Sequence, residues 1–405
     1  MNRNELPAWV NAAIDRIADS PMSLLGRLVA KRLGSPAPFG SIPATVFEQK
    51  PLRVLIAPVN FSGQGTAWSR SLEQVDPEIS ARNMAIEVPG GFSFQADLLV
   101  PVGTYHNDSD WQQRQLEAAS QATHVLIEAE EPPFGRLFGR SVTAQATALL
   151  ERGVDVAYLA HGTDARLPSR HIAGNPLSYY DDPAVYRPRA EQLAARNIAL
   201  VEDSCRPAFV STPDLLVDLP QARWCPVAVD TARWAVPLRA PRTAGTPLRV
   251  VHAPSVAGYK GTPLILPTLE KLAAEGVIEF SLVQGVPSAA MPTRFAKADV
   301  MLDQFRAGSY GVAACEAMAA GCVAVGQVSE QVRSHVRAET GLELPIVEAS
   351  PDTLEHVLRE LAARPDLRPA SEQSTTFVRE VHDGRLAARV LRDSWIRPAT
   401  PERNQ

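Results

Sequence analysis

The chain has 405 residues, enough for two or three ordinary domains. It is 45% hydrophobic and 21% charged, with a formal net charge of -5 and a pI near 6.0. This balance is typical of a soluble globular protein and argues against nucleic-acid binding, which usually needs a strongly basic domain. No apolar run approaches the length that crosses a bilayer, and the N-terminus lacks the pattern of a secretion signal. We therefore expect a cytoplasmic protein.

Residues 8–33 carry apolar residues at helical spacing, with a break around Ser20. The cations among them are Arg16, Arg27, Lys31 and Arg32. Two interpretations stay open: a basic amphipathic helix in peripheral contact with the inner face of a membrane, or a helical extension packed on the first domain. A Pro/Gly/Ser-rich spacer, "GSPAPFGSIPA", follows. We therefore assign residues 1–50 to an N-terminal extension and spacer.

A first α/β unit begins at "LRVLIAPVN" (52–60), a nearly continuous apolar run of the kind found in strands buried on both faces of a parallel sheet. A turn bearing Gly63 and Gly65 leads from this run into a helix. Further apolar runs at 123–129, 154–164 and 207–216 alternate with helical stretches, which is typical of βαβ units. We assign residues 51–230 to a Rossmann-like domain.

Two patterns raise the question of a metal site, and we expect none. "NDSD" (107–110) contains Asp-x-Asp, but it lies in "GTYHNDSDWQQ", which predicts a helix entry with capping and solvated aspartates. The four cysteines form no CxxC pair and no zinc-like spacing with histidine, so we expect buried free thiols. They are Cys205, Cys225, Cys315 and Cys322.

A second α/β unit begins near Pro247, with predicted strands "LRVVHAPS", "IEFSLVQGV", "DVMLDQF" and "CVAVGQ" separated by predicted helices. The segment "WCPVAVDTARWAVPL" around 224–238 joins the two units. The predicted fold class is α/β, with two doubly wound parallel-sheet domains that face each other across a cleft, where ligands should bind. We assign 231–385 to the second domain and expect the tail, 386–405, to pack back on the first.

The stretch "HAPSVAGYKGT" (252–262) places Lys260 between a strand and a helix. A helix N-terminus with free amides favours a phosphate, and an ammonium adds a point charge. The alternative is a solvated surface lysine.

"GSYGVAACEAMAAG" (308–321) repeats this arrangement. Gly308, Ser309 and Gly311 predict a tight turn whose amides point at an anion, with Ser309 as the helix N-cap. Glu316 lies inside the following alanine-rich helix, where its carboxylate is suited to accept both hydroxyls of a ribose. The alternative is an exposed helix residue.

"HGTDAR" (161–166) follows a predicted strand, so His161 and Asp164 should face the cleft. A structural histidine is the alternative. "NFSGQG" (60–65) resembles a phosphate loop only weakly, since it matches neither the dinucleotide nor the lysine-bearing pattern.

Taken together, these stretches resemble the GT-B-fold glycosyltransferases, closest to the retaining family 4 group, also called glycosyl transferases group 1. The likeness is best over 199–330, where "CPVAVDTARW" looks like the family's interdomain hinge, "KGT" its phosphate motif and "EAMAAG" its acidic helix motif. The resemblance implies a nucleotide-diphosphate sugar as donor, with UDP the first choice. It further implies retention of configuration, with neither a protein nucleophile nor a metal or other cofactor.

Carried over by position, the resemblance implies that Lys260 contacts the donor diphosphate and His161 the donor sugar. It places Glu316 on the ribose and Val286 beside the base. The phosphates would meet the amides of the turn, whose residues are Ser309, Tyr310, Gly311 and Val312. The first domain would hold the acceptor and the second the donor.

The chain departs from the family pattern at two positions. Gly308 stands where the family usually has a second glutamate that touches the donor sugar, and we expect Asp303 or Gln304 to take over part of that role. Ser255 stands where an arginine usually helps to clamp the phosphates. Arg70 and Arg306 are the candidates to replace it.

The sequence therefore predicts a hexosyltransferase-type enzyme with an unidentified acceptor, which could be a glycan, a lipid-linked intermediate or a natural product. One alternative is a non-catalytic GT-B homologue that binds a sugar nucleotide or a partner protein. A sugar-nucleotide 2-epimerase is the less favoured alternative, because no carboxylate pair suited to acid/base chemistry stands at a matching place.

Overall fold

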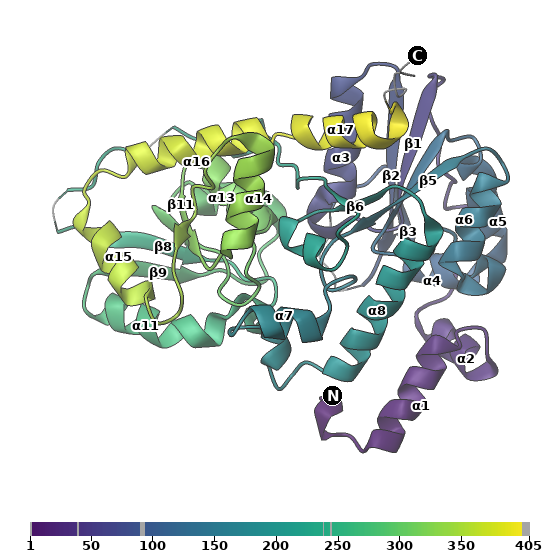
Figure 1. The fold of residues 1–405 in the computed structure, drawn as a ribbon, viewed down its shortest axis with the longest axis horizontal. Coiled ribbons are helices and arrows are strands. Elements are labelled where there is room, and N and C mark those ends of the chain that lie inside the picture. Colours follow the sequence, from purple (N-terminus) through teal and green to yellow (C-terminus); the bar gives the residue numbers. More distant parts are fainter. Residues whose placement is uncertain (1, 39, 90–93, 238, 244, 399–405) are drawn as a thin grey trace, which may run out of the picture.

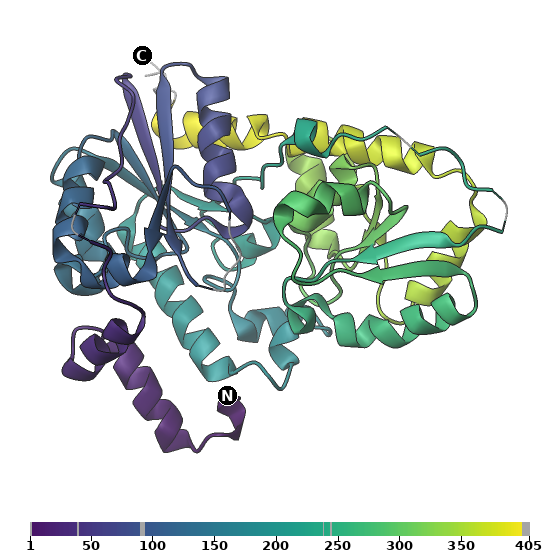
Figure 2. The same cartoon turned by 180° about the vertical axis from the view of Figure 1, so that it is seen from behind.

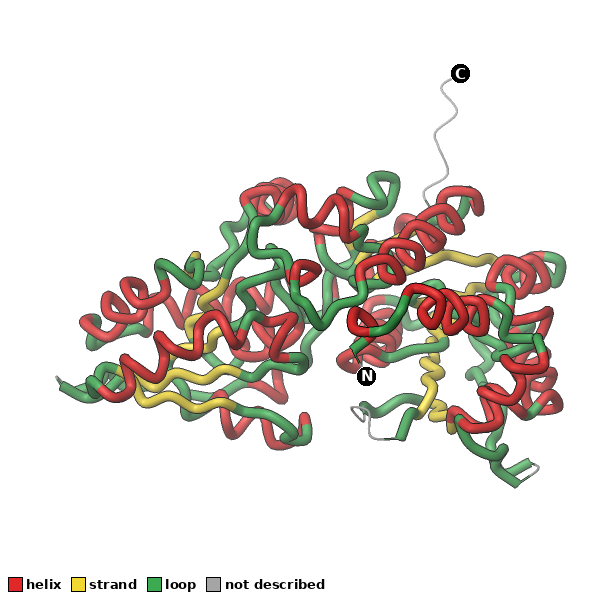
Figure 3. Tube along the Cα trace, turned by 90° about the horizontal axis from the view of Figure 1, so that it is seen from below, coloured by secondary structure: helices red, strands yellow, loops and turns green. Residues whose placement is uncertain are grey.

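The computed structural model describes residues 2–38, 40–89, 94–237, 239–243 and 245–398. Two α/β lobes lie side by side, the first built from the N-terminal half and the second from the C-terminal half (Figure 1). Each lobe contains one parallel sheet, so the predicted α/β class with two parallel-sheet domains is confirmed. Helices flank the strands of both sheets (Figure 3).

The first sheet has seven parallel strands in the order β3-β2-β1-β4-β5-β6-β7. Its central strand β1 pairs with β2 on one side and β4 on the other. The chain adds β2 and β3 on one side of β1 and then β4 to β7 on the other side, so a switch point lies between β1 and β4. Ligands bind at such switch points. The strands are β1 (Leu52–Ala57), β2 (Ile79–Glu87), β3 (Leu98–Pro101), β4 (His124–Glu128), β5 (Asp155–Ala160), β6 (Ala208–Val210) and β7 (Arg223–Trp224).

The central strands are apolar throughout because both of their faces are buried. On β1, Leu55 and Ala57 belong to one hydrophobic cluster, whereas Val54 and Ile56 belong to a second one on the opposite face. The helices of this lobe are α3 (Gln64–Val75), α4 (Val102–Asn107), α5 (Ser109–Ala119), α6 (Val142–Leu150), α7 (Pro168–Gly174) and α8 (Arg187–Ser204). Asp108 caps α5 by accepting a hydrogen bond from the Trp111 amide (2.8 Å), which confirms its predicted capping role.

The strand β2 has no counterpart among the predicted strands, because polar residues interrupt its apolar pattern. Ser80 and Asn83 are nevertheless fully buried. The Ser80 hydroxyl accepts from the Glu48 amide (3.1 Å), and the Asn83 side chain donates to the Ile56 carbonyl (3.0 Å). Tertiary hydrogen bonds thus make burial of these polar residues tolerable, and a single sequence does not reveal such bonds.

The second sheet has five parallel strands in the order β12-β11-β10-β8-β9, with its switch point between β8 and β10. They are β8 (Leu248–His252), β9 (Ile278–Leu282), β10 (Val300–Leu302), β11 (Val323–Gly326) and β12 (Val347–Glu348). The helices of this lobe are α9 (Thr231–Trp234), α10 (Ala257–Lys260), α11 (Thr262–Ala274), α12 (Met291–Phe295), α13 (Val312–Ala319), α14 (Glu330–Thr340), α15 (Leu354–Ala363) and α16 (Arg368–Val381).

The C-terminal segment crosses from the second lobe to the first (Figures 1 and 2). Helix α16 packs on α13, whereas α17 (Arg385–Leu391) packs on α3, and Trp395 donates to Asp155 of β5 (2.9 Å). Between the two helices, the buried His382 hydrogen-bonds the Val227 carbonyl through Nδ1 (2.8 Å). The crossing segment and the joining segment are therefore tied together.

A second connection between the lobes lies around residues 171–182. The Arg306 guanidinium of the second lobe donates to the carbonyls of Leu177 (3.1 Å) and Ser178 (2.8 Å) and pairs with Asp182 (2.8 Å). His171 adds a hydrogen bond to the Ala307 carbonyl (3.1 Å). The lobes thus contact each other directly as well as through the chain crossings.

All four cysteines are free. Three are buried as predicted, but Cys205 is exposed, which corrects that prediction. Cys205 caps the C-terminus of α8 with a left-handed backbone (φ 51°), a surface position at a helix end. Within the described residues, no helix is long and apolar enough to span a membrane.

Candidate functional site

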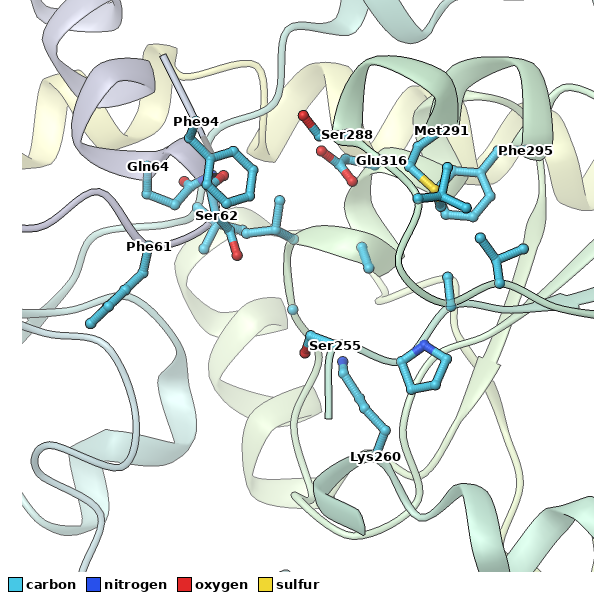
Figure 4. Close-up of a pocket in the computed structure, with 18 of the residues that line it drawn as sticks. Phe61, Ser62, Gln64, Phe94, Ser255, Lys260, Ser288, Met291, Phe295 and Glu316 are labelled. Carbon is cyan, nitrogen blue, oxygen red and sulfur yellow. Dashed lines mark hydrogen bonds between the residues drawn. The ribbon is translucent and has the colours of Figure 1, made fainter. Parts of the chain in front are cut away.

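A cavity of about 570 Å³ lies between the lobes, within the range of small-molecule sites. Side chains of the first lobe, among them Phe61, Ser62 and Gln64, face it from one side, and Lys260 and Glu316 of the second lobe enter it from two others (Figure 4). The segments that follow β1, β5, β8 and β10 all contribute lining residues, so the cavity lies at the carboxyl ends of both sheets.

Lys260 lines this cavity and is held in place by a buried acid. Its Nζ donates to Asp303 Oδ1 (2.7 Å), and the Asp303 side chain is only 2% exposed. Among the described lining residues, Lys260 is the one lysine or arginine. An ammonium has three hydrogens, so it can keep Asp303 and still donate to a ligand.

Helix α13 begins beside this lysine. Its cap is Gly311, and Gly311, Val312 and Ala313 all line the cavity. The amides of the first helical residues have no partner within a helix, so those of Val312 and Ala313 are available to an anion. A Cβ on Gly311 would lie 3.9 Å from Lys260 Nζ, which places the ammonium next to the helix N-terminus.

Ser309 is not the N-cap of α13, because the helix begins three residues later and its cap forms no side-chain hydrogen bond. The Ser309 hydroxyl is buried near Asp214 instead. Tyr310 points away from the cavity as well: it is 3% exposed, and its hydroxyl lies 3.1 Å from His382 Nε2. Of the predicted turn, only Gly311 and Val312 therefore contact the cavity.

Glu316 projects into the cavity from α13 (Figure 4). It has no hydrogen-bond partner among the described residues, and the neighbours it meets on its helix are mostly alanines. Burial raises the pKa of Glu316 to about 7, a shift that Arg233 partly opposes. An ionisable group with a shifted pKa and no protein partner is characteristic of a binding site.

The structure does not bring the two proposed substitutes for donor-sugar recognition into the cavity. Asp303 is occupied by Lys260, and the Gln304 side chain donates to the Ser309 carbonyl (2.5 Å). Both residues are buried behind the lining.

The two candidate arginines also lie elsewhere. Arg70 pairs with Glu73 and Asp97, and Arg306 is part of the contact between the lobes. Neither fills the place left by Ser255, which itself lines the cavity.

Gly308 has a left-handed backbone (φ 68°), which disfavours any larger residue there. A Cβ at this position would lie 3.5 Å from the side-chain nitrogen Nδ2 of Asn175, at the contact between the lobes. The left-handed backbone therefore favours glycine over the usual glutamate at 308.

His161 lines the cavity directly after β5 and is oriented by a carboxylate. Its Nε2 lies 3.0 Å from Oε1 of Glu128, which is fully buried at the end of β4. Burial raises the pKa of Glu128, whereas its hydrogen bond with His161 acts to lower it. Asp164 does not line the cavity; it accepts from the amides of His161 (2.7 Å) and Gly162 (2.5 Å) and so shapes the turn.

Gly63 and Gly65 do not line the cavity, although Phe61, Ser62 and Gln64 do. Gly63 supplies the left-handed cap of α3 (φ 77°). A Cβ on Gly65 would lie 2.3 Å from the side-chain nitrogen Nδ2 of Asn83, so this glycine allows α3 to approach the sheet. The glycine turn has a packing role in this structure.

Sequence reasoning missed Glu128 and three aromatic lining residues, Phe61, Phe94 and Phe295. Glu128 had a signal, since it lies near the end of the predicted strand "THVLIEA", next to the strand that precedes His161. Phe61 packs edge-on against His161, with ring centroids 5.2 Å apart. Nothing local marks these phenylalanines, because they meet the site only through the fold. No metal-binding cluster of three or more His, Cys, Asp or Glu occurs in the part of the chain that the structure describes.

No family model and no curated protein matches this chain. Solved structures do match its fold. A sucrose-phosphate synthase from Thermosynechococcus elongatus aligns with a TM-score of 0.54 at 11% identity, over 85% of this chain and 98% of that one. WaaG, a glycosyltransferase involved in lipopolysaccharide biosynthesis, aligns with 0.51 at 14% identity, over 84% and 99%.

An α-glucosyltransferase, solved with UDP and a 13-mer DNA, aligns with a TM-score of 0.53 at 9% identity, over 85% of this chain and 98% of that one. These alignments span both lobes of the chain. At such low identities they establish architecture and not activity. With its two facing parallel-sheet domains, the chain has the GT-B fold.

Proposed function

We propose that this protein is a glycosyltransferase that moves a sugar from a nucleotide-diphosphate sugar to an acceptor hydroxyl. One observation carries the proposal: Lys260, the free amides of Val312 and Ala313, and the unpartnered carboxylate of Glu316 converge on one cavity of a GT-B fold. The ammonium of Lys260 and the two amides are suited to bind a diphosphate, and the carboxylate of Glu316 is suited to accept hydrogen bonds from a ribose. UDP is our first choice of nucleotide, since one neighbour was solved with it.

In this proposal, the donor diphosphate lies between Lys260 and the start of α13, and the base lies near Val286. The ammonium and the amide dipoles stabilise the negative charge that develops on the leaving diphosphate. His161, positioned by Glu128, contacts the donor sugar from the first lobe. Holding donor and acceptor together in the cleft lowers the entropic part of the barrier.

We further propose that transfer proceeds with retention and without a protein nucleophile. Glu316 is the one carboxylate that lines the cavity among the described residues, and ribose binding would occupy it. The departing phosphate would then take the acceptor proton on the same face of the sugar. The same observation disfavours epimerase chemistry, which needs acid/base groups around the sugar.

A non-catalytic homologue is the second candidate. It is favoured by the left-handed Gly308, whose backbone disfavours the usual sugar-binding glutamate. Such a protein would keep the nucleotide site without turnover.

Two measurements test the proposal. Calorimetric titration with UDP, GDP and ADP reports nucleotide binding, and release of nucleotide from a donor panel, with and without acceptors, reports turnover. Binding together with acceptor-dependent release supports the transferase. Binding without release from any donor supports the non-catalytic candidate. If none of the three nucleotides binds, both the transferase and the non-catalytic candidate are contradicted.

A further inference from the structure

Helix α1 (Ala8–Asp19) is attached to the first lobe by its polar face. Asn11, Asp15 and Asp19 recur every four residues and so lie on one side of the helix. Asp15 and Asp19 form ion pairs with Arg189 of α8 (3.6 and 2.7 Å). Trp9, in contrast, is 75% exposed. Val10 and Ile17 are half-buried, so it is the side of α1 bearing Trp9 that presents an apolar residue to solvent.

Helix α2 (Leu24–Arg32) also presents apolar side chains to solvent. Its inward face consists of the small residues Gly26 and Ala30; a Cβ on Gly26 would lie 2.5 Å from the Ser20 carbonyl. Asn107 of α4 anchors this face by donating to the Ala30 carbonyl (2.9 Å). Four apolar side chains are exposed by 82, 57, 57 and 48%: Leu24, Leu25, Leu28 and Val29.

A loop of the first lobe extends the same surface. Arg136 donates to the Pro21 carbonyl (2.6 Å), so residues 136–140 adjoin the connection between α1 and α2. Phe138 in this loop is 48% exposed and has a left-handed backbone (φ 52°), which is unfavourable for an aromatic residue. Neither burial nor backbone preference within the chain explains this placement. We call the exposed faces of α1 and α2, together with loop 136–140, the α2 patch.

The α2 patch is positively charged although the chain carries a net charge of -5. Its cations on α2 and the loop are Arg27, Lys31, Arg32, Arg136 and Arg140. Within the described chain, only Arg140 has a carboxylate partner, Glu131 at 3.2 Å. Partial burial and then the neighbouring Arg27 and Arg140 lower the pKa of Arg136, which shows that these charges lie close together.

We propose that the α2 patch docks this protein, peripherally and reversibly, on a membrane surface that contains anionic lipid. The exposed leucines, Trp9 and Phe138 would enter the interface between headgroups and acyl chains, and the cations would contact lipid phosphates. A second copy of the chain fits this surface poorly, because a symmetric dimer would place cations against cations.

In Figures 1 and 2, α1 and α2 lie at the end of the first lobe where α4 is found. Helix α2 packs on α4, which begins directly after β3, and loop 136–140 follows the carboxyl end of β4. The patch therefore adjoins the same edge of the first sheet as His161. This orientation favours an acceptor carried at the membrane surface, an inference that rests on the proposed function, whereas the docking itself does not.

The chain contains its own reporter for docking. Of its six tryptophans, all except Trp9 are buried. Adding vesicles of phosphatidylcholine with phosphatidylglycerol to the full chain should shift the fluorescence to shorter wavelength, and vesicles of phosphatidylcholine alone should not. Trp9→Phe should abolish the shift while the protein still co-sediments with the anionic vesicles.

Variants separate the contribution of the cations to membrane binding from that of the exposed leucines. Arg27→Gln with Lys31→Gln should weaken co-sedimentation by about 30-fold, because each cation near an anionic surface contributes about fivefold. Leu24→Ser with Leu28→Ser should weaken it by more than about tenfold. The matched controls are Arg294→Gln with Lys297→Gln and Leu264→Ser on the second lobe, which should bind as the unaltered chain does.

Three outcomes would overturn the proposal: no binding to anionic vesicles, equal binding to neutral ones, or a concentration-dependent dimer that the leucine variants dissociate. Unchanged thermal unfolding shows that a variant has kept its fold. UDP titration of the same variants, without lipid, tells a failure of docking from a failure of the nucleotide site.

Discussion

Lys260 and Asp303 form a buried pair in which the acid positions the cation for a ligand. The two residues are 43 positions apart in the sequence, and Lys260 Nζ lies 2.7 Å from Asp303 Oδ1. The Asp303 side chain is 2% exposed. Removing one member of a buried ion pair leaves the other uncompensated, which typically costs about 3–5 kcal/mol. An experiment on Lys260 therefore has to separate ligand binding from folding.

We predict that Lys260→Met combined with Asp303→Asn lowers UDP affinity by about 10- to 100-fold, the contribution of a charge-assisted hydrogen bond. The double variant removes the ammonium without leaving a buried charge, so it should unfold at nearly the same temperature as the unaltered chain. Lys271→Ala, which removes a surface lysine paired with Glu355, is the control and should bind normally. Titration calorimetry that finds unchanged affinity in the double variant would contradict the phosphate assignment.

Glu316 should make nucleotide binding depend on pH. Its pKa is raised to about 7 by burial, and a carboxylate that accepts ribose hydroxyls binds best when ionised. Between pH 8 and pH 6 we therefore predict that UDP affinity falls by about tenfold more in the unaltered chain than in Glu316→Gln. Titration of both proteins cancels the protonation of UDP itself, and identical pH profiles would exclude the ribose role.

The same carboxyl predicts a stability effect without ligand. A group whose folded pKa lies above its unfolded value stabilises fully below the unfolded pKa of 4.5, and this stabilisation is lost as the pH rises through about 7. Glu316→Gln should therefore raise the free energy of unfolding by on the order of 2 kcal/mol at pH 8 and change it little at pH 4. Urea unfolding at the two pH values measures this difference.

At the scale of elements, the C-terminal crossing depends on Gly384, which caps α17. It has φ 95°, and a Cβ there would lie 2.0 Å from the Ser71 hydroxyl of α3. Gly384→Ala should therefore lower the free energy of unfolding by about 1–3 kcal/mol through backbone strain and this contact. Gly341→Ala is the matched control: it has a similar left-handed backbone (φ 71°) but no atom within 4 Å, so its cost should be smaller. Equal urea midpoints for the two variants would argue against tight packing of α17 on α3.

At the scale of the whole molecule, Arg306 holds the lobes together by a contact separate from the chain crossings. Arg306→Ala should cost about 2–4 kcal/mol and increase the radius of gyration of the unliganded protein in small-angle scattering. Arg242→Ala is the control, because Arg242 binds carbonyls such as those of Leu361 and Arg364 within one lobe. It should be destabilising without changing the radius, and an unchanged radius in Arg306→Ala would show that the hinge alone sets the spacing.

Most strands of both sheets were predictable because a strand buried on two faces needs a continuous apolar run, such as Val54 to Ala57, and such a run is visible in the sequence. Strand β2 was not, since Ser80 and Asn83 satisfy their polar groups through partners distant in sequence. Lys260, Glu316, His161 and the start of α13 were also identified from local patterns, and Val286 from the family resemblance; the structure places them all around one cavity.

The periodicities, the strand ends and the helix entry on which this placement depends can be read from the sequence, because each is a local property of backbone and side chain. Which polar groups remain free to bind a ligand depends instead on the packing of the folded chain. Asp303 and Gln304 are occupied by Lys260 and Ser309, and Arg306 joins the lobes. Among the residues that the structure describes, Glu316 alone keeps an unpartnered carboxylate in the cavity. Pairing of this kind joins residues far apart in the chain, so no window of sequence contains it.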